Sequence, residues 1–160
     1  MAIRGIHHVA VSTHDLDRLV RFYEEALGFT PVSEQFAWSD SPEIDSIIGV
    51  EGSAARTVML KAGNAYLEIF EFSSPASAST TPKAPNDRGY THFAVDSDDI
   101  AADFARLQAA GMRFVRSEYG DMGEIKAIYG SDPDGNVIEL QQVAPAHPTS
   151  LARRRLPVND

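Results

Sequence analysis

The hydrophobic positions of this chain follow two periods, and the order of these periods repeats. Residues 8–12 and 92–96 place apolar side chains at alternate positions, as strands do. Residues 16–27 and 100–110 come shortly after them and carry apolar side chains at the spacing of an amphipathic helix. The pattern therefore predicts a strand followed by a helix in each half of the chain.

The two halves also match residue by residue. HVAVSTHDL starts at His8 and HFAVDSDDI starts at His92, an offset of 84 residues. Each predicted helix ends at a glycine, Gly28 or Gly111, where we expect a left-handed C-cap. Such an internal repeat indicates that one structural module occurs twice.

Three further strands complete each half. The segments GNAYLEIFEF (residues 63–72) and GNVIELQQV (residues 135–143) both read as strands that start after a Gly-Asn turn. Each half therefore reads βαβββ, and we expect an α+β fold in which two paired modules form one cupped, mixed sheet. The other predicted strands are residues 29–32, 55–62, 112–115 and 124–130, and an insertion in the first half has a short helix near residues 42–48. The expected division is a first module at residues 1–72, a Ser/Pro/Ala-rich linker at 73–89, a second module at 90–143 and a tail at 144–160.

Alternation along these strands brings four polar side chains to one side of the predicted sheet. His8 and His92 stand in the first strand of their modules, and Glu68 and Glu139 stand in the last. The helices are expected to cover the other face, so the four side chains point into an open concave surface. The residues expected under the helices are Val9, Leu67, Phe93 and Ile138.

These four polar residues together suit a metal ion, although each alone is more often a hydrogen-bonded strand residue. Two carboxylates in one cavity are costly without a cation, and two neutral imidazoles with two carboxylates balance a 2+ charge. The chain has no cysteine, which excludes disulfides and thiolate ligands. Nitrogen and oxygen donors suit one Zn, Ni, Co, Mn or Fe ion, with positions left for water or substrate oxygens.

The histidine next to His8 is expected to differ from it. His7 should point to the opposite face of the strand and pack near the helix or the linker, because adjacent strand residues alternate. Its counterpart in the second half is Thr91, whereas His8 matches His92. We therefore expect replacement of His8 to remove the metal and replacement of His7 to leave it bound.

Charge and composition exclude some partners. The net charge of −9 over 160 residues disfavours nucleic acid and anionic membranes. The sequence shows neither a signal-peptide pattern nor an apolar run long enough to span a bilayer, so we expect a cytoplasmic protein. The basic run at residues 153–155 reads as solvated surface; the alternative is an arm that closes over substrate or contacts a second chain.

Four segments resemble the vicinal oxygen chelate superfamily, also called the glyoxalase/bleomycin resistance/dioxygenase fold: IHHVAVSTHDLDRLVRFYEEALGF, AYLEIFEF, GYTHFAVDSDDI and DPDGNVIELQ. The resemblance covers residues 4–143. It implies two βαβββ modules around one metal ion, and the family's four metal positions match His8, Glu68, His92 and Glu139. It also implies a homodimer, with the metal site formed within one chain or shared between two.

The ligand set narrows the activity that this resemblance implies. A complete His-Glu-His-Glu set is similar to that of metal-dependent glyoxalase I, whereas the layout is similar to methylmalonyl-CoA epimerases, which usually have Gln at the second position. Both imply a lyase or isomerase that moves a proton next to a carbonyl through an enediolate or enolate. Glu139 would be the base and Glu68 its partner, and the small-molecule substrate would be a thiol adduct or an acyl-CoA.

Two other activities stay open. An extradiol-type dioxygenase would use Fe(II) held by two His and one Glu, and a resistance protein of the bleomycin-binding type would hold a small molecule without reacting. Aromatic side chains could line the substrate pocket, with plain core packing as the alternative for each. The candidates are Phe36, Trp38, Tyr66, Phe70, Tyr90 and Tyr129.

Overall fold

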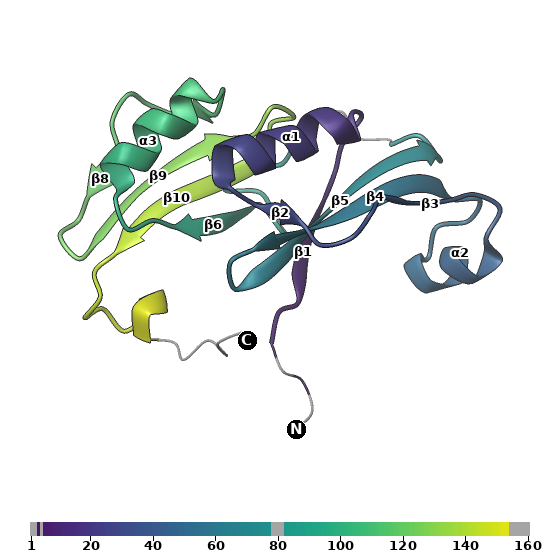
Figure 1. Ribbon diagram of the computed structural model, residues 1–160, viewed down its shortest axis with the longest axis horizontal. Helices are drawn as coiled ribbons and strands as arrows, with labels where there is room; N and C mark the ends of the chain where they lie inside the picture. Colours follow the sequence, from purple (N-terminus) through teal and green to yellow (C-terminus); the bar gives the residue numbers. More distant parts are fainter. Residues whose placement is uncertain (1–2, 4, 78–81, 154–160) are drawn as a thin grey trace. The chain divides into compact units, whose positions relative to one another are not determined.

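The computed structural model describes residues 3, 5–77 and 82–153, and the chain divides into two compact units. The first unit spans Met1–Thr81 and the second spans Pro82–Asp160. Each unit contains one five-stranded mixed sheet with a helix packed on it (Figure 1). The predicted α+β class with two βαβββ units is confirmed.

Both units have the same order of elements, apart from one extra helix in the first and a final 3-10 helix in the second. The first unit contains β1 (His8–Ser12), α1 (Leu16–Leu27), β2 (Thr30–Pro31), β3 (Phe36–Trp38), α2 (Pro42–Ile48), β4 (Ala54–Ala62) and β5 (Ala65–Ser74). The second contains β6 (His92–Asp96), α3 (Ile100–Ala109), β7 (Arg113–Phe114), β8 (Gly120–Asp121), β9 (Ile125–Ser131), β10 (Val137–Val143) and the 3-10 helix η1 (Leu151–Arg153). The helix expected in the insertion is α2.

The strand that follows the helix is broken into two short segments in each unit. β2 and β3 both pair with β4, and β7 and β8 both pair with β9. The sequence pattern predicted only the first segment of each, because a strand of two or three residues is too short to show a period.

The helices cover the sheet faces that alternation predicted. Leu67 and Ile69 of β5 are buried where α1 packs, and Ile138 and Leu140 of β10 are buried where α3 packs. Val9 is an exception, at 38% exposure, because β1 is the edge strand of its sheet. The face of each sheet away from its helix is called the open face below.

The helix ends follow ordinary capping rules. Asp15 caps α1 and Asp99 caps α3, each through its side chain. Gly28 ends α1 with a left-handed backbone at φ 70°, as predicted. The cap of α3 is Ala110, whose backbone is not left-handed, and the predicted glycine, Gly111, follows it with φ 96°.

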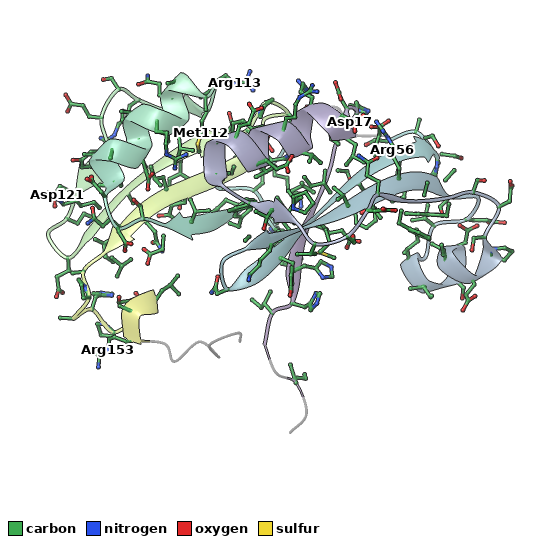
Figure 2. The ribbon with its side chains drawn as sticks, in the orientation of Figure 1. Asp17, Arg56, Met112, Arg113, Asp121 and Arg153 are labelled. Carbon is green, nitrogen blue, oxygen red and sulfur yellow. The ribbon has the colours of Figure 1, made fainter. Side chains whose placement is uncertain are left out.

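The predicted linker and tail are partly described. β5 runs to Ser74, two residues into the predicted linker, and residues 78–81 lie outside the described residues. In the tail Ser150 is buried, and Arg153 donates a hydrogen bond to a backbone carbonyl of the same segment (Figure 2). Residues 154–155 of the basic run also lie outside the described part. No helix within that part combines the length and hydropathy that a membrane span requires.

One carboxylate ties α1 to its sheet. Glu71 of β5 lies on the helix face, where its Oε2 accepts hydrogen bonds from the Leu16 backbone N–H at 2.7 Å and from Nη2 of Arg56 at 2.9 Å. Arg56 also donates to Asp17 at 3.1 Å, and Figure 2 shows these two side chains together beside α1. The hydrogen bond from Arg56, followed by that from Leu16, holds the pKa of Glu71 below its ordinary value.

The second unit ties its helix with a neutral side chain at the equivalent place. Gln142 follows Glu139 by three residues, as Glu71 follows Glu68. Its Oε1 accepts from the Ile100 backbone N–H at 3.2 Å, and its Nε2 donates to a backbone carbonyl in the turn before α3. Both units therefore provide a side-chain acceptor for the first N–H of the helix, but only the acceptor in the first unit, Glu71, is charged.

We expect Glu71→Ala to destabilise the protein by about 2 kcal/mol, because the Leu16 N–H and Arg56 both lose their acceptor. Glu71→Gln should cost less than half of this, since an amide oxygen can still accept from Leu16, as Gln142 does from Ile100. Urea unfolding of both variants measures the difference. Equal losses for the two variants would contradict the assigned role of the helix-capping acceptor.

The acid side of the stability curve should depend on the same residue. Because the folded state lowers the pKa of Glu71 from about 4.5, its contribution is present above that value and is lost as the pH falls through the folded pKa. Unfolding free energies measured from pH 6 down to about pH 3 should therefore fall less steeply in Glu71→Gln than in the wild type. An unchanged slope would argue against this coupling.

Candidate metal centre

The first candidate pair lies on the open face of the first unit. Parallel pairing of β1 with β5 sets His8 opposite Tyr66 and Ala10 opposite Glu68, so His8 and Glu68 share a face. His8 Nε2 lies 3.3 Å from Glu68 Oε2. The hydroxyl of Thr57, on β4, donates a hydrogen bond to the other carboxylate oxygen at 3.4 Å. The strand register thus produces a histidine and a glutamate side by side.

The second pair repeats this arrangement in the second unit. β6 pairs with β10 so that Ala94 lies opposite Glu139, and His92 Nε2 lies 3.5 Å from Glu139 Oε2. The Tyr129 hydroxyl is 3.4 Å from the same imidazole nitrogen. Partial burial, and then the charge of Glu139 and a hydrogen bond with it, raise the pKa of Tyr129 above its ordinary value.

The donor groups of the two pairs fit a divalent cation. The Glu68 and Glu139 side chains are only 20% and 19% exposed. Among the described residues neither carboxylate forms an ion pair with a lysine or arginine, and each faces an imidazole nitrogen that can itself bind a metal. Neither unit, within its described residues, gathers three or more metal-binding side chains by itself. Each unit therefore presents one imidazole nitrogen and one carboxylate on its own open face.

An aromatic cluster lies on the open face of the first unit. The Trp38 ring is 5.9 Å from Phe36, in a stacked arrangement, and 6.1 and 5.9 Å from Phe70 and Phe72, which it meets edge-on. Phe36, Trp38 and Phe70 are three of the predicted pocket residues. Sequence reasoning missed Phe72, although its place two residues after Phe70 on β5 puts it on the same face.

The inserted helix α2 supports this cluster. The indole Nε1 of Trp38 donates to Ser53 Oγ at 2.8 Å, and the Ser53 hydroxyl donates in turn to the carboxylate of Asp45 on α2. Ser53 is buried, and its hydrogen bond is the main reason that the pKa of Asp45 lies below its ordinary value. The chain of hydrogen bonds fixes the orientation of the Trp38 ring.

The other predicted pocket residues are placed differently from one another. Tyr129 packs against His92 with ring centroids 4.9 Å apart. Tyr66 lies opposite His8 in the β1–β5 ladder. Tyr90 comes just before β6 and is fully exposed. Two of these three tyrosines are therefore next to a candidate ligand.

The expectation that His7 points away from His8 is wrong. His7 precedes β1, so strand alternation does not govern it, and its Nδ1 lies 3.0 Å from His8 Nδ1. Its ring packs against Tyr66 at a centroid distance of 4.9 Å. Thr91 makes the equivalent contact in the second unit, with its Oγ1 3.0 Å from His92 Nδ1.

Comparison with known proteins agrees with the fold. The family model of the Glyoxalase/Bleomycin resistance protein/Dioxygenase superfamily matches residues 5–140, and the chain belongs to this superfamily. Members of the superfamily usually bind a divalent metal and commonly act as dimers on small molecules.

Individual relatives cover most of the chain. It is 29% identical to a virulence protein of Salmonella typhimurium, over 89% of this chain and 86% of the relative. It is 30% identical to a 2-epi-5-epi-valiolone epimerase of Actinomyces, over 85% of this chain and 78% of the relative. The solved structure of a glyoxalase family protein from Bacillus cereus matches with a TM-score of 0.78 at 19% identity, covering 90% of this chain and 99% of that one.

We expect Ser53→Ala to make the ring of Trp38, the single tryptophan of the chain, more mobile, because its indole N–H loses its acceptor. The near-UV circular dichroism of Trp38 should weaken, and stability should fall by about 1 kcal/mol. Ser33→Ala, which removes an exposed hydroxyl between β2 and β3 of the same unit, is the control and should change neither signal. An unaltered tryptophan spectrum in Ser53→Ala would show that the hydrogen bond does not hold the ring.

Proposed function

We propose that this protein is a divalent-metal-dependent isomerase or lyase that transfers a proton next to a carbonyl group, in the manner of glyoxalase I or an acyl-CoA epimerase. The observation that carries the proposal is the repeated pair of one imidazole and one carboxylate, His8 with Glu68 and His92 with Glu139. A relative named as an epimerase, at 30% identity, supports the same class of reaction.

The proposed ligands of the metal ion are these four residues, contributed by one chain or shared between two. Two neutral imidazoles and two carboxylates balance a 2+ charge, and the absence of cysteine favours Zn, Ni, Co, Mn or Fe held by nitrogen and oxygen. When bound, the ion supplies Lewis acidity, which makes a C–H next to a carbonyl easier to deprotonate.

The proton itself is moved by the carboxylates of the chain. Glu139 takes the proton from the carbon next to the carbonyl and returns it to the neighbouring carbon or to the opposite face. Glu68 is its partner, and the Thr57 hydroxyl, which donates to Glu68, keeps that carboxylate oriented. A carboxylate that acts as base would have to detach from the ion, and His8 and His92 would be the ligands that hold it meanwhile.

The aromatic cluster would hold the part of the substrate that does not react. Phe36, Trp38, Phe70 and Phe72 lie on the same open face as Glu68, and Phe36 is 56% exposed. Such a surface favours an apolar group attached to the reacting carbonyl. We propose a small-molecule thiol adduct or acyl-CoA as the substrate and a homodimer as the active form.

Elemental analysis and solvent deuterium exchange test this proposal together. The purified protein should contain one divalent metal ion per site, and it should exchange deuterium into one member of a panel of 2-oxoaldehyde–thiol adducts and acyl-CoA thioesters. Glu139→Gln should lower exchange by about 100-fold or more, because the base is lost. Glu71→Gln alters a glutamate on the helix face and should leave exchange at the wild-type rate.

Other outcomes would favour the alternatives. Oxygen uptake with a catechol in the Fe(II) form would indicate an extradiol dioxygenase. Tight ligand binding that yields no product and survives chelation would indicate a binding or resistance protein. Absence of stoichiometric metal, or full exchange in Glu139→Gln, would contradict the proposal.

A further inference from the structure

Each candidate ligand histidine has its second ring nitrogen next to the residue that precedes it in the chain. His8 directs Nε2 toward Glu68, and its Nδ1 is 3.0 Å from His7 Nδ1. His92 directs Nε2 toward Glu139, and its Nδ1 is 3.0 Å from Thr91 Oγ1. The contact therefore occurs independently in both units, through two different side chains.

The chemistry of imidazole gives these contacts a role. A nitrogen that binds a metal uses its lone pair, so the proton of the neutral ring is on the other nitrogen. A hydrogen bond from that second nitrogen to an acceptor fixes both the tautomer and the orientation of the ring. A threonine hydroxyl can accept such a bond. A histidine can accept it only at a nitrogen that carries no proton.

We propose that His7 and Thr91 are positioning residues that accept a hydrogen bond from Nδ1 of His8 and His92, respectively, and so hold each Nε2 ready for the metal. This inference rests on the proposed function, because it assigns His8 and His92 as ligands. It also changes the expectation from strand alternation, under which His7 has no part in the site.

The surroundings of His7 support this assignment. Its ring packs against Tyr66, which the β1–β5 ladder sets opposite His8, so the imidazole is held beside the ligand. The His7 carbonyl also accepts a hydrogen bond from the Tyr66 backbone N–H at 3.0 Å. In the proposed arrangement His7 has its proton on Nε2 and presents a bare Nδ1 to His8.

Zinc affinity of the full chain, measured against a competing chelating dye, tests the inference. His7→Phe keeps a ring against Tyr66 but removes the acceptor, and Thr91→Val does the same for the hydroxyl. Each should weaken Zn²⁺ binding by about 10- to 100-fold, whereas His7→Asn and Thr91→Ser, which can still accept, should stay within about 3-fold of the wild type. His14→Phe alters an exposed histidine before α1 and should bind like the wild type.

The outcomes separate this inference from the proposed function. Wild-type affinity in both His7→Phe and Thr91→Val would overturn the inference alone, whereas failure of the wild type to bind Zn²⁺ would contradict the metal site itself. A measurement on the wild type avoids any problem with variant folding. In the Zn²⁺-loaded protein the Nδ1 protons of His8 and His92 should be visible by NMR and slow to exchange with solvent. Fast exchange of both protons would overturn the inference as well.

Discussion

The parallel pairing between the first and last strand of each unit is the constraint on which the candidate site depends. It sets His8 and Glu68 on one face of a ladder, two positions apart, and does the same for His92 and Glu139. A slip of one residue would turn every side chain of the moved strand to the other face. Burial of Leu67 and Ile69 on the helix face prevents such a slip, because it would expose both. The packing of the core thus determines which polar side chains reach the open face.

The same strand carries two glutamates whose surroundings are opposite in kind. Glu71 accepts hydrogen bonds from the Leu16 N–H and from Arg56, so the guanidinium of Arg56 balances its negative charge. Glu68 lies on the other face, where an imidazole and a hydroxyl are its partners. In the second unit the position of Glu71 is taken by Gln142, which caps α3 without a charge. The acceptor of the helix N–H is therefore charged only in the first unit, as Glu71. On the open face, by contrast, both units have a glutamate.

The sequence predicted those parts of the structure that follow a period or a repeat. Alternation and the 84-residue repeat placed His8 and His92 equivalently, and the βαβββ order followed from the same match. His7 was misplaced because alternation was extended one residue beyond the start of β1. The strand β3 escaped prediction because it is short, and its pairing with β4 depends on contacts far apart in sequence. The support of Trp38 by Ser53 and Asp45 likewise depends on how the inserted helix folds back, which no local pattern reveals.

The two pairs differ at one position of the ladder, the residue directly across from the carboxylate. Met59 is the cross-strand partner of Glu68, whereas Tyr129 is the cross-strand partner of Glu139. A tyrosine with a raised pKa keeps its proton at neutral pH and can donate a hydrogen bond, which methionine cannot do. The first unit instead carries the aromatic cluster. Glu68 also has a hydroxyl donor, from Thr57, so a donor beside the carboxylate is common to both units. In the proposed mechanism the two units differ instead in the apolar surface for the substrate, which the first unit carries.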